Sequence, residues 1–392
     1  LDDKLRITRQ LDHFGIDFIE GGWPGSNPKD EDYFREVKNM DLEHAKITAF
    51  SSTRRADIKA EEDPNIIKLL NAGIDYVTIF AKSWDLHVAD ALQVSLAENI
   101  EMINDTISFL KSKGLNVIYD AEHFFDGYVS NPEYALKTLK AAADAGAEIL
   151  VLCDTNGGIL PTQLTKIIRE VKNNFETPLG IHAHNDSSVA VANSLAAYEE
   201  GIVQIQGTVG GLGERCVNAD LCSVIPALQL KYKEKVVTDE QLKQLKPLYF
   251  FVTETANLIP RNNKPYVGKS AFTHKGGIHV SAVRKNPHTY EHIEPNLVGN
   301  ERRVLVSELA GKSNLRYKLK EIGFDLNDFS DQMIKKLIKR VKALENEGYQ
   351  FEGAEASLIL LAFREFKDYE SFFEIDDFRT NSVNRDNETY SE

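Results

Sequence analysis

Residues 116–158 read NVIYDAEHFFDGYVSNPEYALKTLKAAADAGAEILVLCDTNGG and contain one complete strand–helix–strand unit. The apolar runs Asn116–Asp120 and Glu148–Cys153 have the length and the β-branched content of buried strands. Between them, Pro132–Ala145 has the 3.6-residue apolar period of an amphipathic helix, and Gly146 follows as a C-terminal cap. This alternation predicts two parallel strands joined by a helix.

The same unit recurs from residue 15 to about residue 232. The predicted strands are Asp17–Glu20, Lys46–Phe50, Asp75–Phe80, Asn116–Asp120, Glu148–Cys153, Leu179–His182 and Val203–Thr208. Helices predicted between them include Ala89–Lys113 and Ser188–Glu200, and one further helix, Asp2–Phe14, has no strand ahead of it. Glycine caps are expected at Gly15, Gly73, Gly114 and Gly146.

Seven parallel strands fit either an open doubly wound sheet or a (β/α)8 barrel. Polar side chains follow nearly every strand, as in a barrel, whereas an open sheet gathers them at one switch point. The unpaired helix Asp2–Phe14 is what a barrel without its first strand would leave. We therefore expect an α/β fold, a (β/α)8 TIM barrel that lacks its first strand, followed by a small α-rich subdomain.

The alternation of strands and helices stops in the later part of the chain. Residues 248–315 are rich in Pro, Gly, Asn and His and predict an irregular subdomain. Residues 328–347 predict a Lys-rich amphipathic helix, and a further helix, a strand over Phe372–Arg379 and a frayed polar end follow. The expected divisions are a barrel over residues 1–235, a linker and subdomain over 236–325, and a connector with the start of another domain over 326–392.

Composition limits the function classes. The chain has 46 basic and 60 acidic residues and a formal charge of −14, which opposes binding to nucleic acid or to an anionic membrane. No run of about 18 apolar residues is present, so no membrane span is expected. Three cysteines, Cys153, Cys216 and Cys222, give no disulfide framework. The chain starts without Met or a signal-peptide pattern, and a cytoplasmic location is the expectation.

His182 and His184 end a predicted strand as an H-x-H pair. Residues i and i+2 of a strand share one face, so both imidazoles can face one ion, and Asn218 beyond the next strand could add an oxygen. The alternative is a packing or hydrogen-bonding role, but the strand-end position favours metal binding. A hard divalent ion also prefers a carboxylate, from a missing first strand or from Asp186, which could instead cap the next helix.

Other polar groups stand at strand ends. Glu20, Glu122 and Asp154–Gly158 would converge on one barrel mouth, and the loop Gly210–Arg215 could approach an anionic ligand through its backbone N–H groups. Solvated surface groups and a plain flexible turn are the alternatives. Outside the barrel, a Gly-rich stretch contains His274, His279 and Tyr290, where histidines are ordinarily surface residues.

Several stretches together resemble a known family. They include FIEGGWPGSNPKD (18–30), TIFAKSWDLHVADAL (78–92), LCDTNGG (152–158), HAHNDSSVAVANS (182–194), GTVGGLGERCVNADL (207–221), AFTHKGGIHVSAV (271–283), YEHIEPNLVGNERRVLVSELAGKSNL (290–315) and GYQFEGAEAS (348–357). In this order they resemble the citramalate synthase branch of the 2-isopropylmalate and homocitrate synthase family, which belongs to the DRE-TIM metallolyases.

The resemblance implies that acetyl-CoA, pyruvate and water give (R)-citramalate and CoA, in branched-chain amino-acid biosynthesis. It implies a divalent ion (Mg²⁺, Mn²⁺ or Zn²⁺) and a homodimer whose subdomain reaches the partner's barrel. Its Asp-Arg-Glu segment would lie ahead of Leu1, and its regulatory domain would lie mostly after residue 392, so we expect a fragment whose own activity is in question. The implied residues are Glu122, His279 and Tyr290 for catalysis, Glu20, Thr155, Asn156 and Arg215 for substrate, and His182, His184 and Asn218 for metal.

Two other functions stay open. A sister synthase would use 2-ketoisovalerate or 2-ketoglutarate, as 2-isopropylmalate and homocitrate synthases do, because few pocket side chains separate such substrates. A superfamily lyase is disfavoured by the segments at 271–315. In a different class, a truncated, inactive homologue would keep the fold only as an oligomerisation or effector-binding module.

Overall fold

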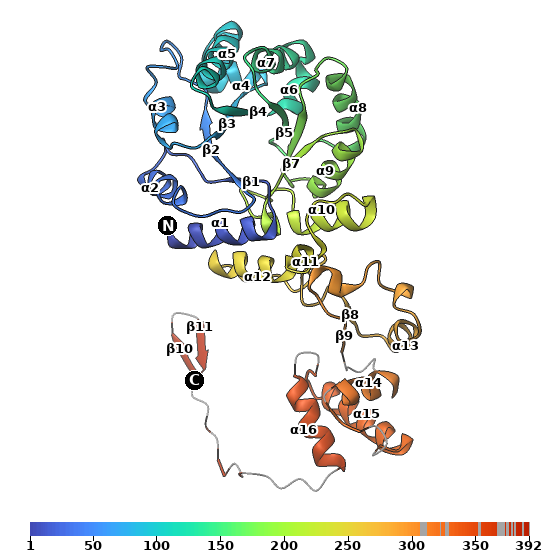
Figure 1. Ribbon diagram of the computed structural model, residues 1–392. Coiled ribbons are helices and arrows are strands. Elements are labelled where there is room, and N and C mark those ends of the chain that lie inside the picture. Colours follow the sequence, from blue (N-terminus) through green and yellow to red (C-terminus); the bar gives the residue numbers. More distant parts are fainter. Residues whose placement is uncertain are drawn as a thin grey trace. The chain divides into compact units, whose positions relative to one another are not determined.

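The computed structural model describes residues 1–305, 312–321, 323–325, 329–351, 354–366, 373, 376–377, 379, 382–385 and 388–391. The chain forms two compact units (Figure 1). The first unit contains Leu1–Phe272 and Ile293–Glu301, and the second contains Thr273–His292 and Arg302–Glu392. Within the described residues, no helix is long and apolar enough to cross a membrane.

A parallel sheet forms the centre of the first unit. Its strands are β1 (Phe18–Glu20), β2 (Lys46–Ser52), β3 (Tyr76–Lys82), β4 (Asn116–Glu122), β5 (Ile149–Asp154), β6 (Leu179–Ala183) and β7 (Gln204–Gln206). Each strand pairs with the next one in the chain, so the strand order never reverses. An open doubly wound sheet requires such a reversal. The sheet instead curls into part of a barrel with helices on its outer side (Figure 1), and the predicted TIM-barrel fold is confirmed.

Helices precede, connect and follow the strands of this sheet. They are α1 (Asp2–Phe14), α2 (Pro28–Val37), α3 (Pro64–Asn71), α4 (Asp85–His87), α5 (Leu96–Ser112), α6 (Phe124–Ser130), α7 (Pro132–Asp144), α8 (Pro161–Lys172), α9 (Ala190–Glu199) and α10 (Leu221–Ala227). Asn27, Asp63 and Asn131 each accept a backbone N–H at a helix start, and a proline occupies the first turn that follows. These local signals explain why α2, α3 and α7 begin where they do.

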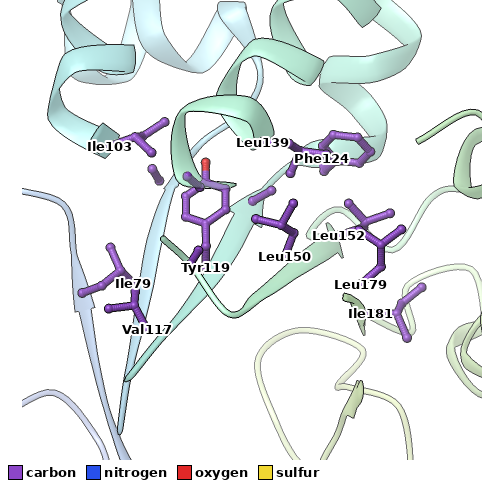
Figure 2. Close-up of a cluster of buried hydrophobic side chains, with 14 of the residues drawn as sticks. Ile79, Ile103, Val117, Tyr119, Phe124, Leu139, Leu150, Leu152, Leu179 and Ile181 are labelled. Carbon is purple, nitrogen blue, oxygen red and sulfur yellow. The ribbon is translucent and has the colours of Figure 1, made fainter. Parts of the chain in front are cut away.

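Side chains of the strands alternate between two environments with a period of two residues. Val117, Tyr119 and Ala121 of β4 are buried against the helices, in the same core as Leu150 and Leu152 of β5. Figure 2 shows strand side chains of this kind, including Ile79, Leu179 and Ile181, lying with Ile103, Phe124 and Leu139 of the helices. The intervening residues therefore face the concave side of the sheet, where Ile118, Val151 and Cys153 form a small separate cluster.

The leading helix α1 packs on the second apolar cluster of this unit. Phe14 is buried there with Leu248 and Val252 of α12 (Leu245–Thr255), and α1 lies beside α12 in Figure 1. Gly15 ends α1 with a φ of 97°, which only glycine adopts readily, so the predicted cap is confirmed. A short helix, α11 (Asp239–Leu242), precedes α12.

The predicted single helix Ala89–Lys113 is wrong. A π-helical turn, Val88–Leu92, ends at Gln93, which has a φ of 57° in the left-handed region. Ser95 then starts α5 afresh, because its Oγ accepts the backbone N–H of Glu98 at 3.1 Å. The apolar period runs through both segments, so periodicity alone could not locate the break.

The second unit has its own core. Strand β8 (Thr273–His274) pairs in parallel with β9 (Arg303–Val304), next to α13 (Gly277–Lys285) in the chain. The helices α14 (Lys312–Glu321), α15 (Asp331–Asn346) and α16 (Glu355–Phe366) bury a cluster that includes Leu315, Leu337 and Leu358. The Lys-rich helix predicted over 328–347 corresponds to α15.

Two predictions for the later residues are wrong. Residues 248–315 are not wholly irregular, because α12 and α13 fall there, and an irregular composition did not prevent short helices. The polar end is not frayed, since β10 (Ser382–Arg385) and β11 (Glu388–Ser391) form an antiparallel hairpin. The strand predicted over Phe372–Arg379 falls mostly outside the described residues, as does part of the family-like stretch 290–315.

Candidate active site

The carboxyl ends of the strands carry polar side chains on the concave face. Alternation from the helix-facing residues puts Glu20, Lys82, Glu122, His182 and Gln206 on this face. The carboxyl ends of barrel strands are where barrel enzymes hold their catalytic groups. The sheet therefore brings the polar groups predicted from separate strand ends to one mouth.

The two histidines of the H-x-H pair face each other. Nε2 of His182 lies 3.3 Å from Nε2 of His184. Ligand nitrogens about 2.0–2.1 Å from a shared ion would have a separation close to this. Burial, followed by the nearby charges of His182 and Arg215, lowers the pKa of His184 to about 4, so this imidazole is neutral at pH 7. A neutral imidazole is the form that binds a metal.

Asn218 is held beside this pair by backbone pairing. It forms an isolated antiparallel bridge with His184, and the N–H of Ala219 donates to Ala183 O at 2.9 Å. Its Nδ2 donates to Leu212 O at 3.1 Å, whereas its Oδ1 is buried without a hydrogen-bond partner. An orphaned buried carbonyl oxygen next to two imidazoles fits a cation ligand. Among the described residues, no group of three His, Cys, Asp or Glu side chains could hold a metal, so the amide is needed in this set.

Asp186 does not cap the next helix, and it has another partner. Its oxygens accept Nε of Arg215 at 3.0 Å and an Nη of Arg215 at 3.1 Å, and these bonds lower the pKa of its carboxyl. The side chain that bonds the start of α9 is Asn185, whose Oδ1 accepts the N–H of Ala190. Asp186 is therefore engaged by a cation of the protein and is not a free metal carboxylate.

Arg215 joins two loops of the mouth. Besides Asp186, its guanidinium donates to Thr155 O at 2.6 Å, so the loop after β7 is tied to the loop after β5. Arg215 has a φ of 50° and Val217 a φ of 75°, which are strained for side-chain-bearing residues. Lys264 secures the start of this loop, with Nζ 2.6 Å from Gly210 O and 3.0 Å from an Asp220 oxygen.

Carboxylates gather on the concave face of β4 and β1. Glu122 is ion-paired with Lys82, its register partner on β3. Burial raises the pKa of Asp120 to about 6. Glu20 is open to solvent on one side but lies within this face, where desolvation and the charge of Asp120 raise its pKa, to about 8. The charge of Glu122 therefore contributes to the raised pKa of Asp120, and the charge of Asp120 contributes to that of Glu20.

Thr155 and Asn156 bind the neighbouring loop after β4. Oγ1 of Thr155 accepts the N–H of His123 at 2.8 Å, and Nδ2 of Asn156 donates to Asp126 at 3.1 Å. His123 has a φ of 57°, and its ring lies 4.0 Å, centroid to centroid, from that of His87. Thr155 and Asn156, two of the predicted substrate-binding residues, therefore lie beside the carboxyl end of β4.

Sequence reasoning missed Asp120, Gln206 and Lys82. Asp120 and Glu122 have the same i and i+2 spacing as the two histidines, and that signal could have identified Asp120. Gln206 and Lys82 are polar residues inside short strands, and their roles follow from the register that places them opposite His182 and Glu122.

His279 and Tyr290 belong to the second unit and contact each other. Their rings are stacked, with centroids 4.1 Å apart and planes at 27°, and both side chains are exposed. His274 is not a surface residue as expected, because it is buried with Nε2 3.0 Å from Glu291. Glu291 also accepts two hydrogen bonds from Arg302, at 2.6 and 2.5 Å. Buried charges are kept in pairs, and Glu291 joins β8, through His274, to Arg302, the residue before β9.

Comparison with known proteins places this site in a family. Residues 1–249 match the HMGL-like family, and residues 266–349 match the homocitrate synthase post-HMGL domain-like family. The solved structure of an HMG-CoA lyase from Bacillus subtilis has the same barrel fold, with a TM-score of 0.56 and 20% identity. The match covers 67% of this chain and 89% of that one.

Relatives with higher identity span both units. An (R)-citramalate synthase of Geobacter sulfurreducens is 54% identical over 97% of this chain and 72% of its own length. The (R)-citramalate synthase of Aquifex aeolicus is 55% identical with the same two shares. A probable 2-isopropylmalate synthase of Methanopyrus kandleri is 32% identical over 89% of this chain and 66% of its own length. The chain therefore belongs to the HMGL-like family, in the branch of the (R)-citramalate synthases.

Proposed function

We propose that this chain is an acyltransferase that condenses acetyl-CoA with pyruvate and water to give (R)-citramalate and CoA. The observation that carries the proposal is the joint presence, at one strand-end mouth, of the His182–His184 pair and the Lys82–Glu122 pair. Five relatives named (R)-citramalate synthase are 45–55% identical to this chain, whereas the 2-isopropylmalate and homocitrate synthases that match are 32–33% identical.

His182, His184 and Asn218 would hold a divalent cation, Mg²⁺, Mn²⁺ or Zn²⁺. The near contact of the two Nε2 atoms and the unpartnered Oδ1 of Asn218 fit such an ion. When bound, the cation supplies Lewis acidity to the keto oxygen of pyruvate. These three ligands are neutral, so the carboxylate of the substrate would add the negative charge that a hard cation prefers.

Glu122 is our candidate for the base. Lys82 is ion-paired with it, and the carboxylate can take a proton from the methyl group of the acetyl thioester. The methyl carbon then bonds to the keto carbon of pyruvate, and the keto oxygen takes up a proton to become the tertiary hydroxyl. Water cleaves the thioester, and CoA leaves as the thiol.

Thr155, Asn156, Arg215 and Glu20 are proposed to bind the substrates. The Arg215 bridge between two loops fixes one wall of the mouth, and Thr155 and Asn156 connect this wall to the loop after β4. Glu20 has a raised pKa and can be protonated near neutral pH, so it can donate a hydrogen bond where a carboxylate could not.

The substrate assignment is tested by measuring CoA release with a thiol reagent. Pyruvate should be preferred over 2-ketoisovalerate and 2-ketoglutarate by about 10- to 200-fold in kcat/KM, the range that a shaped apolar pocket supplies. His184→Ala should abolish turnover and metal content, and His13→Ala, on the exposed side of α1, should change neither. A preference for either larger keto acid would establish a sister synthase, and metal content unchanged in His184→Ala would refute the metal site.

We also propose a homodimer in which His279 and Tyr290 serve the partner's barrel. Support comes from their stacked, exposed rings in a unit separate from the barrel. His279→Ala and Glu122→Ala should each be nearly inactive, and mixing the two should restore part of the activity. In a mixed dimer one site carries neither substitution. No recovery after proven subunit exchange would contradict this arrangement, and a chain without any condensing activity would favour a fold or oligomerisation module.

A further inference from the structure

A chain of hydrogen bonds leads from β4 across the concave face to His182. Oδ1 of Asp120 accepts Nε2 of Gln206 at 2.9 Å, and Oε1 of Gln206 lies 2.8 Å from Nδ1 of His182. Asp120 is buried, and Gln206 is the register partner of His182 on the neighbouring strand. The three side chains therefore form one connected series that ends at the imidazole.

The chemistry of the three groups gives this series a fixed direction. A carboxylate accepts hydrogen bonds and does not donate them, so Asp120 requires the NH₂ side of the Gln206 amide. The amide oxygen must then face His182, and it can bind Nδ1 only if Nδ1 carries the proton. The neutral imidazole has one N–H, and Nε2 of His182 is consequently left with a free lone pair.

The contact between the two imidazoles agrees with this assignment. Nε2 of His182 lies 3.3 Å from Nε2 of His184, and in the metal-free chain two facing nitrogens at this separation form a hydrogen bond in which one donates. Since Nε2 of His182 has no proton, the donor is Nε2 of His184. Nδ1 of His184 is buried with no hydrogen-bond partner, so nothing equivalent to Gln206 fixes that ring. The two histidines are unequal, and His182 is the one prepared in advance to accept a cation.

We propose that Asp120 and Gln206 are positioning residues that hold His182 as the Nδ1–H tautomer, with Nε2 directed to the cation site. This inference rests on the proposed function for the cation, but the tautomer itself is a property of the metal-free chain. Partners of this kind, beyond the ligands themselves, change metal affinity by about 10- to 100-fold when they are removed.

The first experiment records the tautomer without metal. Histidine-selective ¹⁵N labelling and two-bond ¹H–¹⁵N correlation of the full 392-residue chain distinguish a protonated Nδ1 from a protonated Nε2. The His182 signals are assigned from their loss in His182→Ala. We expect Nδ1–H for His182 in the wild type and a mixture, or Nε2–H, in Gln206→Met. An unchanged Nδ1–H form in Gln206→Met would overturn the proposal.

The second experiment titrates Mn²⁺ into the metal-free chain and follows the free ion by EPR. Gln206→Met should weaken binding by about 10- to 100-fold, and Asp120→Asn by a smaller factor, because an asparagine can donate as well as accept and leaves the amide unfixed. The matched control is Gln204→Met, two residues earlier on the same face of β7 and without a hydrogen bond from its Oε1. It should bind Mn²⁺ within about twofold of the wild type.

The outcomes separate the two proposals. If His182→Ala binds Mn²⁺ as tightly as the wild type, the metal assignment itself is wrong. If His182→Ala is weak but Gln206→Met matches the wild type, the metal site stands and the positioning role is overturned. An equal loss in Gln204→Met and Gln206→Met would indicate damage to β7 as a whole and would also overturn it. Far-UV circular dichroism of each variant shows whether the fold is retained.

Discussion

Single side chains connect parts of this molecule that the sequence keeps far apart. The buried carboxylate of Asp12 in α1 accepts backbone N–H groups from Glu43, His44 and Ala45 at 3.0, 2.9 and 2.7 Å. Burial alone would raise the pKa of this carboxyl, but the three hydrogen bonds outweigh burial and lower the pKa. Asp12 thereby binds α1 to the segment that leads into β2.

We predict that Asp12→Asn destabilises the chain by about 1–3 kcal/mol at pH 7. A lowered folded-state pKa gives stability that is present above the unfolded pKa of about 3.9 and is lost as pH falls through the folded pKa. The variant should therefore show a flatter decline in urea-unfolding free energy below pH 4 than the wild type. Asp2→Asn, exposed in the first turn of the same helix, should keep the wild-type slope, and a steep decline in Asp12→Asn would contradict the account.

At this scale the sequence predicted some residues of the site and missed others for physical reasons. His182 and His184 could be paired because strand geometry fixes the face of residues i and i+2. The partner of Asp186 could not be predicted, since it depends on a loop whose Arg215 and Val217 adopt unusual φ values. Asp120 was hidden because a buried carboxylate in an apolar strand looks like an ordinary strand end.

At the scale of helices and strands, features set by local sequence signals were predicted, and a feature without such a signal was missed. Strand positions were predicted to within about two residues, because alternation and β-branched runs are local signals. The break between the π-helical turn Val88–Leu92 and α5 was missed, since one apolar period continues through it. What sets the break is a single hydroxyl, that of Ser95.

Removing that hydroxyl gives a prediction for the element. Ser95→Ala should destabilise the chain by about 0.5–2 kcal/mol, because the N–H of Glu98 loses its acceptor. Ser112→Ala, at the exposed last turn of the same helix, is the matched control and should cost less than about 0.5 kcal/mol. Thermal unfolding of the two variants compares them directly. Equal losses would show that the cap does not define the start of α5.

At the scale of the whole molecule, two cores are present in one chain. Leu152 is fully buried between the sheet and its helices, and Leu337 is fully buried in the cluster of the second unit. The barrel was predictable because its repeat is regular. The start of the second unit was predicted to be irregular because its strands β8 and β9 have only two residues each, below the length at which alternation can be recognised.

Separate cores predict separate responses to substitution. Leu337→Ala should cost about 2–5 kcal/mol locally and should speed amide hydrogen exchange in α14, α15 and α16, while β4 to β6 keep their protection. Leu152→Ala should do the reverse. Hydrogen–deuterium exchange read by mass spectrometry maps both variants, and a uniform increase across the chain in either variant would show that the two units unfold as one.

The strict alternation of the strands has a consequence for how such a chain can change. Neighbouring positions such as Tyr119 and Asp120 are under different constraints. Tyr119 packs against the helices, whereas Asp120 belongs to the polar groups on the concave face. A combinatorial library restricted to concave positions such as Phe50 and Phe80 could therefore yield variants that accept other keto acids, while the helix-facing core stays unchanged. A single-residue deletion inside β3 or β4 would exchange the two roles at once. New specificities in this fold should arise by substitution in the strands, and length changes should be confined to the loops.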